Sequence, residues 1–89
     1  MKEIYTIKDN KANMFNVPFY SIHKNDAVRS FTRAASDPQT NLNQFPNDFD
    51  LYYLGTFDEE TSKFNLMETP QFTIAAAACQ RPQGAIKNE

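Results

Sequence analysis

The chain has few of the residues on which enzymes and metal sites depend. Its 89 residues include one cysteine, Cys79, one histidine, His23, two glycines and no tryptophan. A single cysteine excludes an internal disulfide and a cysteine-based zinc site. No glycine-rich phosphate loop or nucleophile elbow is visible. We therefore expect a protein that is not an enzyme and holds neither a cofactor nor a metal ion.

The chain also lacks long apolar runs and a strong charge of one sign. Without a run of about 18 apolar residues or a leader of signal-peptide type, we expect no membrane insertion and a reducing cytoplasm. The net charge of −2 hides a split, because residues 1–36 hold six Lys and Arg against three Asp and Glu, whereas residues 37–68 hold one against seven. This asymmetry is compatible with a basic half that meets phosphates.

Aromatic residues are abundant, with eight Phe and four Tyr. Within the stretch Phe49–Phe57 they break the alternation of a strand that has one dry and one wet face. Both sides of this strand are apolar and need cover. A regular alternation places Leu51, Tyr53 and Phe57 on one side and Tyr52 and Leu54 on the other.

The remaining pattern predicts an α+β domain of order β-β-α-β-β, a small antiparallel sheet of four to five strands with one helix packed on one face. Asn25 is the expected helix N-cap, Asp37-Pro38 the helix end, and Gln39–Gln44 a polar loop. We expect one domain over residues 1–74 and a tail over residues 75–89. The predicted elements are a helix over Ala27–Ala35, strands Lys2–Lys8, Phe15–Ile22 (broken near Pro18), Phe49–Phe57 and Lys63–Met67, and an additional short strand Gln71–Ile74.

The helix is too small to cover both faces of such a sheet. Ten helical residues span about 15 Å, whereas four strands are about 15 Å across and 17–20 Å long. We therefore expect the second face to form a homodimer interface through Tyr52 and Leu54. Stacking of DNA bases on Tyr5, Tyr20, Tyr52 and Tyr53 is the alternative use of the aromatics, and we favour core or dimer contacts over it.

Candidate phosphate ligands come from the basic half. Arg29 and Arg33 are four residues apart and lie one above the other on the predicted helix. Lys24, Lys8 and Lys11, which precede the helix in sequence, are expected to extend this positive surface. A solvated helix face is an equally good interpretation of the pair. Two carboxylates in the middle of the chain, Asp48 and Asp50, favour a turn and a cross-strand pair over a metal site.

Three segments carry a recognisable pattern: Ile4–Asp9 with Lys11-Ala12, Asn25–Phe31 and the stretch from Pro46 to Thr61. Together they resemble the small non-structural protein of gokushovirus-type microviruses, which are phages with single-stranded DNA genomes. Ile4–Asp9 with Lys11-Ala12, and Asn25–Phe31, are similar to the family's opening and helix. Ser62 stands where the family has a turn glycine, so we expect a different turn geometry there. The central segment matches at Pro46, Asp48, Phe49, Asp50-Leu51-Tyr52, Leu54, Gly55, Phe57-Asp58 and Thr61.

The resemblance implies a non-structural factor of viral DNA replication, absent from the virion and located in the cytoplasm of the infected bacterium. It implies DNA binding during the switch to single-strand production and packaging. We expect single-stranded viral DNA to be the preferred partner. The alternative is a protein–protein adaptor that docks on the viral replication initiator, an assembly factor or a host factor without touching DNA. The acidic middle of the chain favours that alternative.

Overall fold

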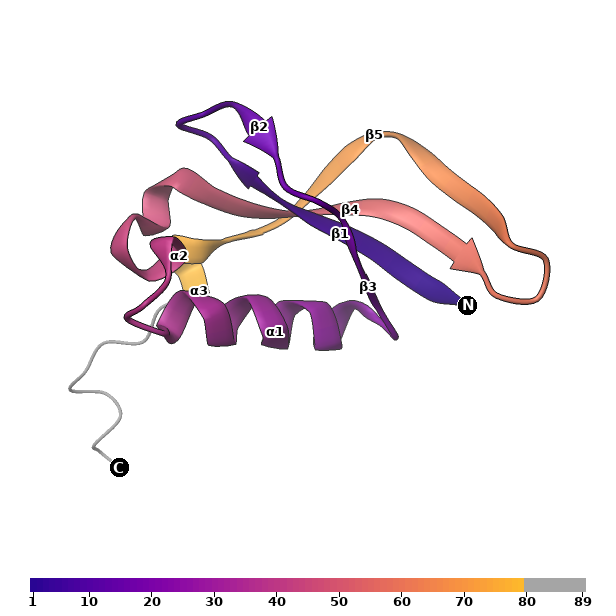
Figure 1. Ribbon diagram of the computed structural model, residues 1–89, viewed down its shortest axis with the longest axis horizontal. Helices are drawn as coiled ribbons and strands as arrows, with labels where there is room; N and C mark the ends of the chain where they lie inside the picture. The colour runs from indigo at the N-terminus through magenta and orange to yellow at the C-terminus, as the bar shows by residue number, and fades with distance from the viewer. Residues whose placement is uncertain (80–89) are drawn as a thin grey trace.

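The computed structural model describes residues 1–79, which form one curled antiparallel sheet with helices on one side of it (Figure 1). The strand order is β2-β1-β4-β5, and β3 pairs with β1 beside β2. The predicted α+β class with an antiparallel sheet is confirmed. In chain order the elements are β1 Lys2–Asp9, β2 Met14–Phe15, β3 Phe19–Ser21, α1 Lys24–Ser36, α2 Asn41–Gln44, the 3-10 turn η1 Pro46–Asp48, β4 Phe49–Asp58, β5 Lys63–Ala75 and α3 Ala76–Cys79.

The N-cap of helix α1 lies two residues earlier than the sequence predicts. His23 is the N-cap, with an extended backbone, and its carbonyl accepts hydrogen bonds from the amides of Asp26 and Ala27. Asn25 therefore lies inside the first turn and is not the cap. One side of the helix is buried, through small and aromatic residues spaced one turn apart: Ala27, Phe31 and Ala35.

The core lies between α1 and the sheet. Tyr5 of β1 and Leu51 of β4 meet Phe31, and all three side chains are almost fully buried. The short helix α3 closes the same core through Ala76 and Cys79, which are 0% and 7% exposed. The predicted boundary at residue 74 is therefore too early, because the packed unit continues through Cys79. Of the predicted tail, residues 80–89 lie outside the described residues.

Two predicted segments differ in detail. The second strand is split into β2 and β3 around Asn16–Pro18, as proline's missing amide predicts. The expected separate strand 71–74 is the continuation of β5 past Pro70, and it pairs with the same partner strand, β4. Part of the expected loop 39–44 is the helix α2, whose N-cap hydroxyl, on Thr40, accepts a hydrogen bond from the Asn43 amide at 3.2 Å.

A bulge in β4 reverses the alternation that the sequence analysis assumed. Ile4 pairs with Gly55 and Tyr5 with Tyr53, so Leu54 is an extra residue opposite no partner. Because a strand's side chains alternate, one extra residue exchanges the two faces beyond it. Phe57 therefore lies on the same face as Tyr52, and not with Leu51 and Tyr53 as a regular strand would place it.

The turn between β4 and β5 contains an unusual backbone. Ser62 has φ of 64°, the left-handed conformation that glycine favours, and its amide donates to the Asp58 carbonyl at 2.7 Å. Serine at position 62 thus adopts a backbone conformation that a turn glycine favours. Among the described residues, no helix is long and apolar enough to cross a membrane.

Candidate functional site

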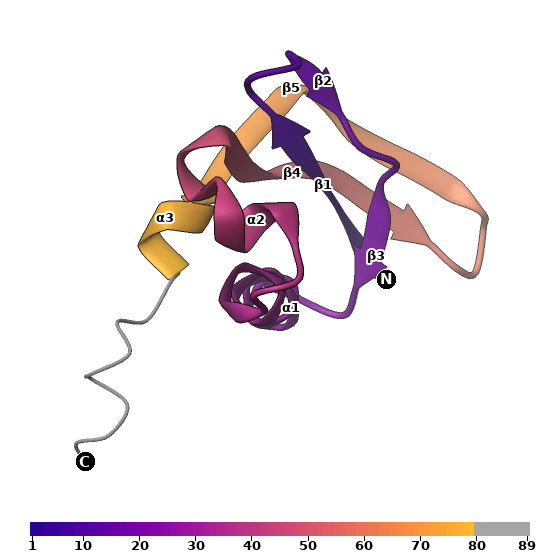
Figure 2. The same ribbon diagram turned by 60° about the vertical axis from the view of Figure 1, so that its left-hand side comes forward.

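The sheet face opposite α1, called the outer face below, is the candidate site. Figure 2 shows the helices gathered on one side of the curled sheet, so that no helix within residues 1–79 covers this face. Alternation along β1 places Lys2, Ile4, Thr6 and Lys8 on the outer face. Their cross-strand partners share it, and they are Phe57, Gly55, Tyr52 and Asp50 on β4 and Tyr20 and Phe15 on the β3 and β2 side.

The first group of rings on this face, the central cluster, consists of Phe15, Tyr52 and Phe72. The Tyr52 ring lies 5.5 Å from Phe15 and 5.9 Å from Phe72, with edge-to-face angles of 82° and 83°. Phe15 and Phe72 are 45% and 59% exposed, whereas Tyr52 between them is half-buried. The cluster thus holds a rigid middle ring and offers two outer rings to solvent.

The second group, the distal cluster, consists of Tyr20, Phe57 and Phe64. Phe57 lies 5.9 Å from Tyr20 and 4.9 Å from Phe64 between ring centroids. Tyr20 and Phe64 are each 53% exposed. Since Tyr52 and Phe57 are on the same strand, β4, the two clusters follow one another along the sheet.

Two small side chains support the clusters from below. Ile4 and Thr6 are 3% and 1% exposed although no helix covers them. The Thr6 hydroxyl donates to the Asn16 carbonyl at 2.6 Å, so its only polar group is paired. The outer rings thus form a second, thin apolar layer that is dry underneath and open above.

The electrostatic character of the outer face differs between the clusters. Lys8 holds its ammonium 5.3 Å from the centre of the Phe15 ring, a cation–π contact. Its cross-strand neighbour Asp50 accepts from the Asn10 amide at 2.8 Å. Near the distal cluster, by contrast, Lys2 forms an ion pair with Glu59 at 2.8 Å. The free positive charge therefore lies at the central cluster.

Glu59 joins the amino-terminal segment to the hairpin end. Its carboxylate accepts from the Lys2 ammonium and, at 2.8 Å, pairs with the Met1 amino group. These hydrogen bonds lower the pKa of Glu59 from 4.5 to about 2. The contact is solvent-exposed, so its contribution to stability is small and it mainly positions the β1 end.

The five predicted DNA-binding cations do not lie on one surface. Lys8 is on the outer face, whereas Lys11 lines a cavity of about 260 Å³ beside Phe45 at the α2 end. Arg29 and Arg33 follow the buried Ala27 and Phe31 by two residues each, a rotation of about 200° around the helix, so they point away from the sheet. Lys24 lies at the start of α1, on the helix side of the sheet.

The aromatic predictions divide in the same way. Tyr52 is the middle of the central cluster, while Leu54, predicted beside it in a dimer interface, is the half-buried bulge residue. Tyr5 and Tyr53 face the helix. Burial raises the pKa of Tyr5, and so does its hydrogen bond to Glu3 at 2.8 Å, so Tyr5 is a neutral core residue and not a displayed ring.

Sequence reasoning missed four of the rings: Phe15, Phe57, Phe64 and Phe72. Each belongs to a strand in which a break or a bulge decides the side of the sheet that a side chain faces. The position of such a break or bulge has no clear signal in a single sequence. The other chemistry-bearing residues form no site. His23 is exposed with Asp26 at 3.8 Å, and Cys79 is buried. In residues 1–79, no group of His, Cys, Asp and Glu is arranged to hold a metal ion.

The fold and its exposed rings define a small α+β protein with one covered and one uncovered sheet face. The chain belongs to the phage ORF5 protein family, whose model matches residues 2–79. It is 34% identical over 77 residues to Protein ORF5 of Chlamydia phage 1, a similarity that covers 82% of this chain and 80% of that protein. No solved structure matches the chain. The predicted resemblance to a microvirus-type phage protein is confirmed at this level.

Proposed function

We propose that this phage protein binds single-stranded DNA on its outer face and acts, without catalysis, in viral DNA replication in the cytoplasm of the infected bacterium. The observation that carries the proposal is the pair of exposed aromatic clusters on one uncovered sheet face, with the Lys8 ammonium beside the first. Proteins that hold single strands use this combination of rings on a sheet and nearby cations. A role in the switch to single-strand production and packaging follows from the family resemblance.

The clusters favour single strands over duplex DNA. Each stacked base contributes about 1–3 kcal/mol, but only a base that is free of its own stack can offer its ring face. The accessible rings are at the ends of the clusters: Phe15 and Phe72 in the first, Tyr20 and Phe64 in the second. A short extended strand therefore has stacking positions at both clusters.

The charge distribution sets a further expectation. For single strands the logarithm of the affinity falls with the logarithm of salt concentration by about 0.7 per neutralised phosphate. Within residues 1–79, Lys8 at the central cluster makes no ion pair, whereas Lys2 is paired with Glu59. With one or two phosphate contacts, we expect a slope no steeper than about −1.5. Binding here depends on stacking more than on charge.

The test is fluorescence anisotropy of labelled oligothymidylate with ring-removing variants. We expect Phe72→Leu to weaken binding roughly fivefold or more, because it removes one stacking ring. Phe45→Leu is the matched control, since Phe45 is equally exposed, 56% against 59%, but lies near α2. Equal affinities of the two variants, or tighter binding of duplex than of single strands, would contradict the proposal.

The second candidate function is self-association through the same face. Leu66, which is 63% exposed and pairs with Gly55 of the outer face, extends the apolar surface beside the distal cluster on β5. A homodimer that buries Tyr52 would compete with DNA for the aromatic rings. In such a dimer, DNA would bind instead through phosphate contacts to Arg29 and Arg33 on the exposed side of α1. Sedimentation at increasing concentration, with and without oligothymidylate, distinguishes the two. If DNA dissociates the dimers, DNA and the partner subunit use the same outer face. If the dimers stay intact when DNA binds, and this DNA binding requires Arg29 and Arg33, the outer face serves self-association and the second candidate is supported.

A further inference from the structure

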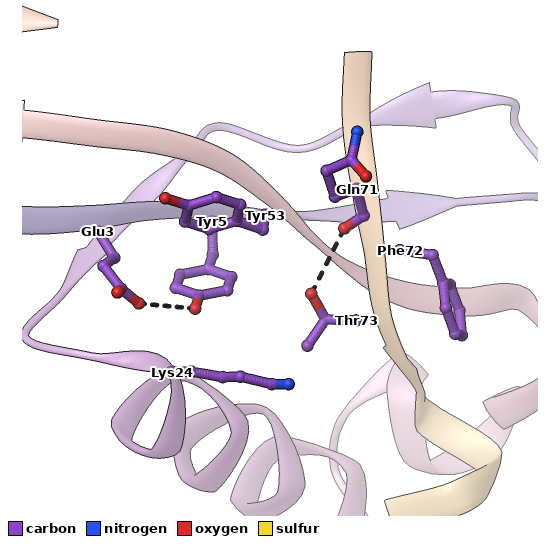
Figure 3. Close-up of a pocket in the computed structure, with 7 residues that line it drawn as sticks. All are labelled: Glu3, Tyr5, Lys24, Tyr53, Gln71, Phe72 and Thr73. Atoms are coloured by element: carbon purple, nitrogen blue, oxygen red, sulfur yellow. Dashed lines mark hydrogen bonds between the residues drawn. The ribbon is translucent and has the colours of Figure 1, made fainter. Parts of the chain in front are cut away.

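A separate cavity lies on the helix side of the sheet, where β5 runs past the start of α1. Its volume is about 330 Å³, and strands β1, β4 and β5 and helix α1 all contribute to its wall. Figure 3 shows Tyr5 and Tyr53 on one side, Thr73 on the other and Lys24 beneath. At this level of β5 the residues are the polar Gln71 and Thr73, and they leave the cavity open. Further along β5, Ile74 pairs with Leu51 and packs against the core.

The wall of this cavity combines flat rings with opposite charges. The Tyr5 and Tyr53 rings lie 5.3 Å apart, tilted by 58°. Tyr5 is buried, so the partly exposed ring of Tyr53 forms the accessible aromatic side. Glu3 receives the Tyr5 hydroxyl on its Oε1 at 2.8 Å, and its Oε2 makes no hydrogen bond within residues 1–79. The Lys24 ammonium likewise makes no ion pair among the described side chains. One strong acceptor and one strong donor are therefore available at the rim.

These groups select a neutral, planar ligand that both donates and accepts hydrogen bonds. A simple anion would gain from Lys24 but meet the Glu3 carboxylate, and a simple cation would meet the reverse. A nucleobase satisfies both groups through its edge, since its exocyclic amines donate to carboxylates and its ring nitrogens and carbonyls accept from lysine. The volume is near the lower limit of about 300 Å³ for small-molecule sites, so it suits one base and not a dinucleotide.

We propose that this cavity binds a single unstacked nucleobase. The proposal rests on the proposed function, since the base would come from the single strand bound on the outer face. The edge strand β5 contributes residues to both sites. Phe72 lines the cavity and also packs edge to face against Tyr52 in the central cluster. A single strand on the outer face therefore reaches the cavity by passing over the β5 edge at Phe72. In this arrangement Lys24 contacts a base and not a phosphate.

The experiment is a titration of the ¹⁵N-labelled full chain with each of the four deoxynucleosides, which carry no phosphate. We expect saturable shifts of the Glu3, Lys24 and Thr73 amide signals with at least one nucleoside. Glu3→Gln, which keeps an acceptor for the Tyr5 hydroxyl, and Lys24→Met should each weaken that binding about tenfold or more, as for a lost hydrogen bond to a charged group. Lys63→Met, on the exposed hairpin end, is the control and should change nothing.

Three results would overturn the inference: no shift with any nucleoside, the same shifts with inorganic phosphate alone, or unchanged affinity in both cavity variants. These results are independent of the outer face. If Phe72→Leu weakens oligothymidylate binding while the cavity signals stay silent, the nucleobase site is wrong and the proposed function stands. If nucleosides bind the cavity but Phe72→Leu and Phe45→Leu bind oligothymidylate equally, the outer-face function is wrong.

Discussion

Replacing Gly55 by alanine tests whether the close approach of β4 and β5 holds the distal cluster together. Gly55 has φ of 144°, a conformation that costs a residue with a side chain about 1–3 kcal/mol. A Cβ at this position would meet the Asn65 carbonyl oxygen at 2.2 Å and the Leu66 Cα at 2.8 Å. Both are backbone atoms, so β5 itself must move, and overpacking of this kind costs a further ~1–3 kcal/mol.

The expected loss in unfolding free energy is therefore about 2–6 kcal/mol, a large part of the 5–15 kcal/mol typical of small domains. At roughly 4–8 °C per kcal/mol for a chain of this size, the midpoint of thermal unfolding should fall by about 10 °C or more. Urea and thermal unfolding followed by circular dichroism measure both quantities. Thr56→Ala, at the next position of the same strand, is the control. A loss below about 1 kcal/mol in Gly55→Ala would refute the close strand approach.

Three other outcomes follow from contacts described above. Ser62→Gly should stabilise the protein by about 0.5–1 kcal/mol in urea unfolding, because φ of 64° suits glycine better than serine, and a destabilised variant would contradict that turn. Ala76→Glu should prevent stable folding while Ala77→Glu changes little, since Ala76 is 0% exposed and Ala77 is exposed; equal effects would return α3 to the tail. Because the pKa of Glu59 is lowered from 4.5 to about 2, its contribution is present above pH 4.5 and is lost as the pH falls toward 2. The difference in thermal midpoint between wild type and Glu59→Gln should shrink over that range, and a difference that grows instead would exclude the Lys2 contact.

The parts of the fold that the sequence predicted correctly are those that depend on local patterns. Helix α1 follows from its apolar spacing and from Asp37-Pro38, and the strand around Leu51 follows from its apolar and aromatic content. The break near Pro18 follows from a missing backbone donor. In each case the physical cause lies within a few residues of its effect, so one sequence is enough to find it.

The candidate site depended on non-local features and was predicted only in part. Tyr52 was placed on an uncovered face, but the partners that define its cluster, Phe15 and Phe72, come from strands that are distant in sequence. The fate of Ala76 and Cys79 was missed because four alanine-rich residues show no periodicity, and only the space beside α1 makes them core. The basic half of the chain was similarly divided by the fold between two sides of the sheet.

The extra residue Leu54 determines which side of the sheet each later side chain of β4 faces, so the two faces depend on the number of residues in the strand. With it, Tyr52 and Phe57 emerge on one side of the sheet; were one residue deleted there, everything from Gly55 to Asp58 would change sides at once. A point substitution alters one ring, whereas a single deletion would turn Phe57 towards the helix side and separate it from Tyr20 and Phe64. Relatives of this chain should therefore vary in length in their turns, and keep the residue count of this strand constant.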